Sequence, residues 1–216
     1  MSNKPLAGIK VVELTTYVAA PVCGRMLADL GADVIKIETR KGDAWRSMGN
    51  GVHMVATEDE NPLFDVFNAH KRSIVLDLKT EQGMAVFRRL IERADVFLTT
   101  TRMKSLRGLG IDPDSLRRDY PQLVFAAMTG YGEKGPDADS PGFDNVAFWT
   151  KTGFLADMAV KTEGSYPVES PTGVGDTVSG MALLGGILAA LLLRERTGEG
   201  DFVTTSLYNT GIWVMS

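Results

Sequence analysis

Short apolar runs alternate along this chain with longer stretches of helical periodicity. Apolar runs of five or six residues are typical of buried strands, and apolar positions three or four residues apart indicate helices that cover a sheet. Strands are predicted at residues 10–14, 33–38, 73–78, 95–100, 123–128 and 201–206. Helices are predicted at residues 21–30, 81–94, 112–118 and 181–193, with a further one beginning at residue 207.

This alternation predicts the fold class. Strands separated by helical segments favour an α/β fold with a Rossmann-like, doubly wound and mostly parallel sheet, flanked by helices on both faces. A length of 216 residues suits one large α/β domain. We therefore expect residues 1–216 to form a single domain.

Two stretches interrupt the pattern. Residues 40–62 are glycine-rich and charged without clear periodicity, and predict a long excursion from the sheet. Residues 130–142 (GYGEKGPDADSPG) are dense in Gly, Pro and Asp, and so predict a loop at the carboxyl end of a strand. Ligands bind at that edge in open α/β sheets.

Asp176 is the most informative single residue. It follows Gly175 and begins an apolar helical run, where backbone N–H groups and the helix dipole would favour an ionised carboxylate. Gly175 and Gly180 would leave room for a large substrate beside it. Two readings stay open on local grounds: a carboxylate nucleophile of acyl transfer, or a residue that only caps its helix.

Composition and charge exclude several classes of partner. A net charge of −4 gives no basic footprint for nucleic acid. The longest apolar stretch, residues 181–193, is shorter than a membrane span, and residues 1–5 carry no apolar leader. The single cysteine, Cys23, favours a reducing compartment, so we expect a cytoplasmic protein. With His53 and His70 as the only histidines, we expect no metal site.

The familiar nucleotide and hydrolase motifs are also missing. The turn after the first strand, residues 15–21 (TTYVAAP), contains no glycine, which argues against a dinucleotide pyrophosphate site. The sequence holds neither a GxxxxGK[ST] phosphate loop nor a GxSxG nucleophile elbow. Basic residues near predicted strand ends are either phosphate ligands or solvated side chains: Lys71, Arg72, Arg102, Lys104 and Arg107.

Several segments, taken in order, closely resemble the family III CoA-transferases. They are residues 6–14 (LAGIKVVEL), 27–38 (LADLGADVIKIE), 71–74 (KRSI), 130–136 (GYGEKGP), 175–180 (GDTVSG) and 197–200 (TGEG). That family includes formyl-CoA, carnitine and 2-hydroxyacyl CoA-transferases and the 2-methylacyl-CoA racemases. The segments span essentially the whole chain.

The resemblance implies an enzyme that moves CoA between an acyl-CoA thioester and a free carboxylic acid. Asp176 would be the nucleophile, and would form an aspartyl anhydride and then an aspartyl-CoA thioester. A carboxylate with its ordinary pKa of about 3.9 would be ionised at neutral pH and need no general base. CoA is then a substrate, with no tightly bound cofactor, and members of the family form interlocked homodimers.

The same resemblance places the CoA contacts at the carboxyl edge of the sheet. They would involve the first turn, the segments after the second, third and fourth strands, and the loop before residue 145. The residues are Val18, Ala19, Thr39, Arg40, Leu76, Lys79, Thr100, Thr101, Arg102, Arg107, Phe143 and Asp144.

Two departures from the family pattern leave alternatives. Racemases place a histidine where this chain has Phe143, so transfer is favoured over racemisation; the loop is most similar to the branch acting on 2-hydroxy acids. Family members are about twice as long, so the chain is expected to lack the small C-terminal domain. A non-catalytic CoA-binding fragment is the second hypothesis, and a 2-methylacyl-CoA racemase the third.

The last predicted helix carries the apolar run Ile212, Trp213, Val214 and Met215 without a capping residue. Apolar surface of that kind normally has a partner. We expect the chain to self-associate or to be marginally stable as a monomer.

Overall fold

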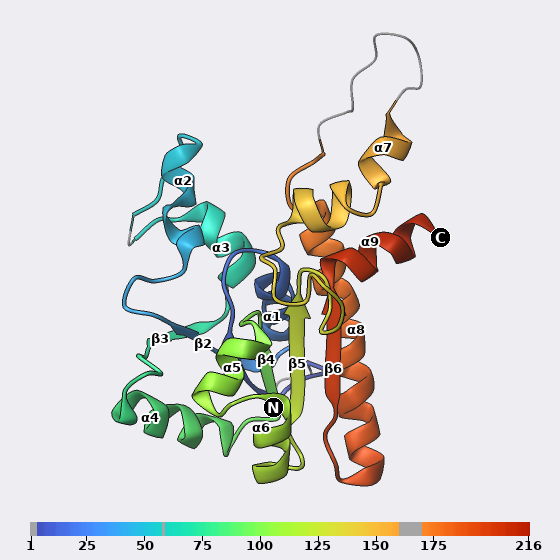
Figure 1. Cartoon of the computed structure of the whole chain (residues 1–216). Coiled ribbons are helices and arrows are strands. Elements are labelled where there is room, and N and C mark those ends of the chain that lie inside the picture. The colour runs from blue at the N-terminus through green and yellow to red at the C-terminus, as the bar shows by residue number, and fades with distance from the viewer. Residues whose placement is uncertain (1–3, 58, 160–169) are drawn as a thin grey trace.

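The computed structural model describes residues 4–57, 59–159 and 170–216. Its centre is a six-stranded, wholly parallel sheet in the order β3-β2-β1-β4-β5-β6 (Figure 1). The strands are β1 Lys10–Leu14, β2 Asp33–Glu38, β3 Arg72–Val75, β4 Val96–Thr99, β5 Val124–Thr129 and β6 Phe202–Ser206. The order reverses between β1 and β4, so the Rossmann-like prediction is confirmed.

Helices cover both faces of this sheet. The longer ones are α1 Ala19–Asp29, α4 Glu81–Ile91, α8 Val174–Thr197 and α9 Leu207–Met215. Shorter helical segments are η1 Ala44–Ser47, α2 Met48–Gly51, α3 Pro62–Asn68, α5 Met103–Leu109, α6 Pro113–Asp119, the π-helix η2 Asp144–Thr150, and α7 Phe154–Met158.

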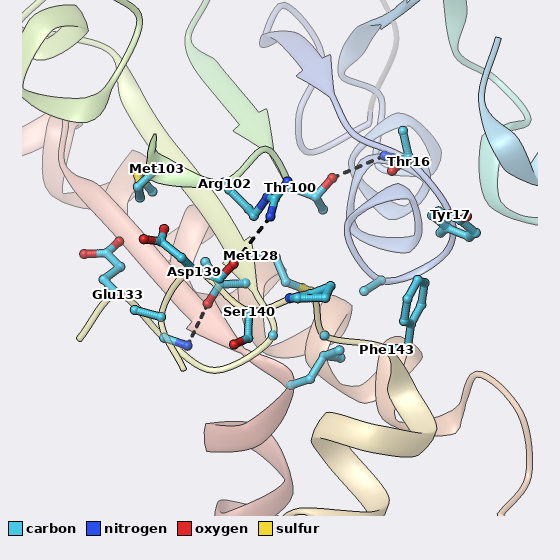
Figure 2. Close-up of a pocket in the computed structure, with 18 of the residues that line it drawn as sticks. Thr16, Tyr17, Thr100, Arg102, Met103, Met128, Glu133, Asp139, Ser140 and Phe143 are labelled. Carbon is cyan, nitrogen blue, oxygen red and sulfur yellow. Dashed lines mark hydrogen bonds between the residues drawn. The ribbon is translucent and has the colours of Figure 1, made fainter. Parts of the chain in front are cut away.

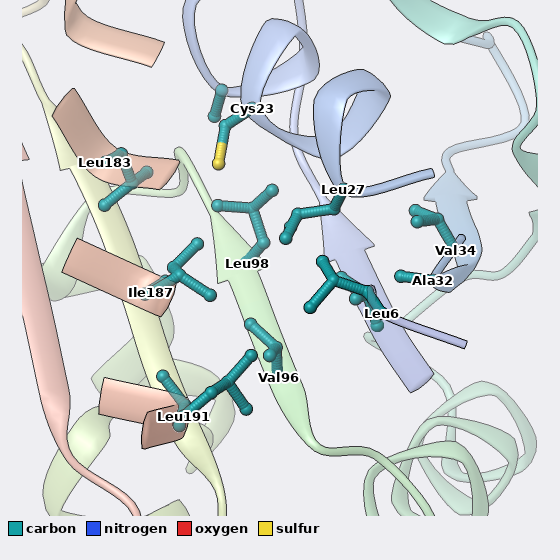
Figure 3. Close-up of a cluster of buried hydrophobic side chains, with 14 of the residues drawn as sticks. Leu6, Cys23, Leu27, Ala32, Val34, Val96, Leu98, Leu183, Ile187 and Leu191 are labelled. Atoms are coloured by element: carbon teal, nitrogen blue, oxygen red, sulfur yellow. The ribbon is translucent and has the colours of Figure 1, made fainter. Parts of the chain in front are cut away.

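Alternation along the strands divides the core in two. One set of strand side chains packs with α1 and α8, where Leu98 lies among Leu27, Leu183 and Ile187 (Figure 3). The neighbouring residues point to the opposite face and pack under α4, α5 and α6. Because successive strand residues point to opposite faces, a strand buried on both sides reads as a continuous apolar run, and this explains the sequence pattern.

Helix α8 is, by length and composition, the one described helix apolar enough to cross a membrane. A soluble core helix passes the same test. Here α8 packs along α1, β5 and β6, and it buries Leu183, Ile187 and Leu191. Its outer side leaves Met181 and Leu192 more than half exposed.

The main differences from the predicted elements lie at the carboxyl edge. Strand β3 ends at Val75 rather than at residue 78, because a turn around Asp77 leads into α4. The side chain of Thr80 caps α4 by accepting the Gly83 N–H. Helices α3, α5, α7 and η2 were not predicted, because their short sequences show little apolar periodicity. Residues 40–62 do leave the sheet, but they contain η1 and α2.

Candidate functional site

A cavity of about 620 Å³ opens at the carboxyl ends of β1, β4 and β5. The turn after β1, the start of α5 and the loop after β5 line it. Asp176 from α8 and Leu207 from α9 complete the lining. This is the edge of an open parallel sheet at which ligands bind.

The two sides of the cavity differ in character (Figure 2). The rings of Tyr17 and Phe143 lie together on one side, edge to face with centroids 5.6 Å apart. Arg102, Glu133 and Asp139 lie on the other, where an Arg102 N–H approaches the Asp139 carbonyl oxygen at 3.5 Å. The cavity therefore has an aromatic side and a charged side.

The cavity continues along the sheet edge. A narrower space of about 180 Å³ shares Thr16 and Thr100 with it and leads past Thr101. That space shares residues with an outer space of about 490 Å³ between the ends of β2 and β3. The three spaces adjoin one another at these shared residues and are together called here the edge groove, whose lining extends from Asp176 to Arg40 and Lys79.

Most residues predicted from the sequence line this groove. Those in the cavity beside Asp176 are Ala19, Thr100, Arg102, Arg107 and Phe143. Those farther along the groove are Thr39, Arg40, Leu76, Lys79 and Thr101. Segments far apart in sequence therefore meet along one surface.

Two predicted contacts lie elsewhere. Val18 is only 3 % exposed, and its backbone begins α1. Asp144 is 8 % exposed and points at the start of α8, where an oxygen accepts the Gly173 N–H at 2.7 Å. Neither side chain lines the edge groove.

Asp176 lies in the first turn of α8, as predicted, and its side chain reaches the cavity. The residue that caps the helix is Gly173, and Asp176 lies beyond it in the first turn, so the capping reading is wrong. The expected low pKa is also wrong: burial, and then the negative charge of Asp144, raise the pKa of Asp176 to about 7. Burial removes water from the charged form, and a nearby like charge disfavours it further.

The two flanking glycines serve packing rather than substrate access. A Cβ at Gly175 would lie well inside 3.0 Å of the Asp144 carboxylate and the Phe148 ring. A Cβ at Gly180 would meet the Ala19 carbonyl oxygen on α1 at 2.6 Å. The expectation that they make room for a ligand is corrected accordingly.

The turn after β1 is held in an unusual conformation. Tyr17 has φ of 64°, a left-handed value that costs a non-glycine residue about 1–3 kcal/mol. Asp43 stabilises it by accepting the Tyr17 N–H at 3.1 Å and the Trp45 N–H at 2.9 Å. Sequence reasoning missed Tyr17 and Asp43, because neither belongs to a motif.

A buried ion network lies beneath this turn. The Lys36 ammonium, fully buried, contacts Asp43 at 2.9 Å and Glu13 at 3.3 Å. Lys71 contacts the other Glu13 oxygen at 2.9 Å. Two cations and two anions thus offset one another, which buried charges require. Lys71 is therefore a structural residue rather than a phosphate ligand, and Arg72 binds Asp33 on the exposed surface.

The described residues contain no group of three or more His, Cys, Asp or Glu side chains that could hold a metal ion. Both histidines lie outside the edge groove. His70 is exposed and contacts Asp29 at 2.7 Å. The carboxyl groups that line the cavity are those of Glu133, Asp139 and Asp176, and only Asp176 comes from the first turn of a long buried helix.

Comparison with known proteins gives a consistent result. Among curated relatives, (R)-2-hydroxy-4-methylpentanoate CoA-transferase of Clostridioides difficile is 42% identical over 210 residues, which are 97% of this chain and 52% of the relative. Cinnamoyl-CoA:phenyllactate CoA-transferase of Clostridium sporogenes is 42% identical over 207 residues, 96% and 50% of the two chains. The chain thus spans about half the length of these relatives.

A solved structure agrees. A CAIB/BAIF family protein from Brucella suis superposes with a TM-score of 0.90 at 34% identity, covering 100% of this chain and 56% of that one. The model of CoA-transferase family III matches residues 6–216. On this evidence the chain belongs to CoA-transferase family III.

Proposed function

We propose that this chain binds an acyl-CoA along the edge groove and presents Asp176 as the nucleophile that accepts its acyl group. The complete reaction would transfer CoA to a free carboxylic acid. The observation that carries the proposal is the position of Asp176: it lies at the start of α8 and lines the cavity at one end of the edge groove, whose far end holds Arg40 and Lys79.

The lining of the groove suits CoA. Leu76, Leu78 and Leu109 form an apolar surface for the adenine in the outer space, beside the basic Arg40 and Lys79 for its phosphates. The narrow middle section at Thr16 and Thr100 suits the pantetheine chain. This direction of binding brings the thioester to the cavity that holds Asp176.

The proposed chemistry begins when an Asp176 carboxylate oxygen attacks the thioester carbonyl carbon. The carbon–sulfur bond breaks, CoA thiolate leaves, and a mixed anhydride forms. The thiolate then attacks the aspartyl carbonyl, so the donor carboxylate is released and an aspartyl-CoA thioester remains. The incoming carboxylate attacks that thioester to form a second anhydride, and the thiolate takes its acyl group to give the new acyl-CoA and free Asp176.

The raised pKa of Asp176 has two opposite effects on the rate of nucleophilic attack. At pH 7 only about half of the carboxyl groups would be ionised and able to attack. Weak solvation leaves the ionised form more nucleophilic than an exposed carboxylate. The first step should therefore accelerate as pH rises through about 7.

An apolar 2-hydroxy acid and its enoyl partner are the proposed acyl groups. Tyr17 and Phe143 form an aromatic side to the cavity, with Phe143 half exposed and free to contact a ligand. The two relatives named above act, by their names, on 2-hydroxy-4-methylpentanoate and phenyllactate, and both acids have apolar side chains.

Two other functions are less well supported. Racemisation needs a base that moves the α-proton, and neither His53 nor His70 lines the groove. By the sequence resemblance, Phe143 stands where racemases have a histidine. The chain could instead bind CoA without turnover. We further propose a homodimer, because Trp213 is 79% exposed on α9 beside the half-exposed Ile212 and Val214. A cytoplasmic location is proposed on the separate ground of the single cysteine, Cys23.

Exchange of labelled CoA into an acyl-CoA separates these functions. The assay uses the 216-residue chain and, if the gene encodes more residues, the complete gene product. Exchange that disappears in Asp176→Asn supports the transferase, whereas tight CoA binding without exchange in either protein identifies a binding module. Solvent deuterium entering the α-position would identify a racemase.

A further inference from the structure

The N-terminus of α8 is occupied by a side chain from another element. Asp144, the first residue of η2, is buried against the first turn of α8. One of its carboxylate oxygens accepts the N–H of Gly173, the residue that caps α8. Its other oxygen, Oδ1, is also buried, lies at the position that a Gly175 side chain would fill, and faces the first N–H groups of α8.

This contact changes what the helix offers to Asp176. The first N–H groups of a helix attract a carboxylate, and a 24-residue helix adds its dipole. Asp144 already takes that position. Among the described residues, no group donates a hydrogen bond to the Asp176 side chain, which faces the cavity instead.

We propose that Asp144 is a positioning residue for the nucleophile: by occupying the amino end of α8 it holds the first helical turn and keeps the Asp176 carboxylate free to enter the cavity. This role rests on the proposed function of Asp176. Asp144 acts through the backbone of Gly173 and through its charge, and it does not line the space available to substrate.

The charged groups near Asp176 are few. From η2 the nearby charge is Asp144, and it raises the Asp176 pKa together with burial. Arg102 before α5, Arg107 on α5, and Glu133 and Asp139 on the loop after β5 line the same cavity but do not contribute to that shift. The described surroundings thus single out Asp144 as the charge that opposes ionisation of Asp176.

Two substitutions separate the charge of Asp144 from its hydrogen bond to Gly173. Asp144→Asn keeps a carbonyl oxygen for the Gly173 N–H but removes the charge, whereas Asp144→Ala removes both. Asp139→Asn is the matched control, since it removes a carboxylate that lines the same cavity from the loop after β5. Circular dichroism checks that each variant is folded.

The first readout needs no catalysis. Carbon-13 NMR of labelled aspartate carboxyls follows the Asp176 titration, with its signal assigned by its loss in Asp176→Asn. We expect the titration midpoint to fall by about one pH unit in Asp144→Asn, the effect of removing one nearby like charge. Asp139→Asn should keep the wild-type midpoint. An unchanged midpoint in Asp144→Asn would show that the Asp144 carboxylate does not lie beside Asp176 at the start of α8, and would overturn the proposal even if Asp144→Ala fails to fold.

The second readout is the rate at which acyl-CoA modifies Asp176. Asp144→Asn should react within a few-fold of wild type at pH 8, and its rate–pH profile should move to lower pH. Asp144→Ala should react about 10- to 100-fold more slowly while it binds CoA normally, because the carboxylate is misplaced. Wild-type reactivity in Asp144→Ala would contradict a positioning role. If wild type itself is never acylated, the proposed function fails, and the NMR titration still decides the role of Asp144.

Discussion

Gly175 gives the sharpest structural test of how α8 is docked. In Gly175→Ala the new Cβ would overlap both the Asp144 carboxylate and the Phe148 ring. Asp144 is tied to Gly173 by a hydrogen bond and Phe148 is 1 % exposed, so neither can move away freely. Overpacking of this kind costs about 1–3 kcal/mol.

Gly185→Ala is the matched control on the same helix. A Cβ at Gly185 meets no atom within 4 Å. Alanine favours a helix over glycine by about 1 kcal/mol, so this variant should be more stable than wild type. The same propensity gain applies to Gly175→Ala, and the difference between the two variants therefore isolates the overlap at about 1–3 kcal/mol.

Urea and thermal unfolding measure this difference. For a chain of this length 1 kcal/mol corresponds to about 2–4 °C in Tm, so the Tm of Gly175→Ala should lie about 2–12 °C below that of Gly185→Ala. Equal stabilisation of the two variants would refute the close approach of Asp144 and Phe148 to α8.

Two further predictions concern binding and association. Replacing Arg102 and Arg107 together by Ala should weaken CoA binding about tenfold or more and reduce the salt dependence of binding. Lys104→Ala changes a residue of α5 that lies outside the groove, and it should leave binding unchanged. Equal calorimetric affinities of wild type, the double variant and Lys104→Ala would leave the two arginines without a role in binding. Trp213→Ser should reduce self-association in light scattering by removing the large apolar side chain that is most exposed among the described residues, and an unchanged oligomeric state would place the interface elsewhere.

Much of the fold follows from local pattern. The buried strands are continuous apolar runs because both faces of the sheet are covered, and β1 and β2 were predicted with the residues that the structure gives them. Asp176 could be placed at a helix start because Gly175 and the apolar run after it mark that boundary. Its position on the groove then follows from the carboxyl-edge rule and the family resemblance.

What the sequence could not supply depends on contacts between distant segments. Asp144 contacts Gly173, which lies 29 positions later in the sequence. This contact explains why the pKa predicted for Asp176 was too low and why Gly175 packs against Asp144 instead of making room for a substrate. Lys71 read as a solvated or phosphate-binding residue because its partner Glu13 lies 58 positions away. Charge burial, and hence a shifted pKa, is a property of the assembled fold rather than of any segment.

The central claim is that Asp176 is the acylated residue and that its ionisation controls the reaction. The direct measurement is to mix the protein with an acyl-CoA at several pH values, trap the product with hydroxylamine and map the hydroxamate by peptide mass. The account predicts a hydroxamate at Asp176, formed at a rate that rises with pH through a midpoint near 7. Modification of another residue, or a rate independent of pH between about 5 and 8, would contradict it.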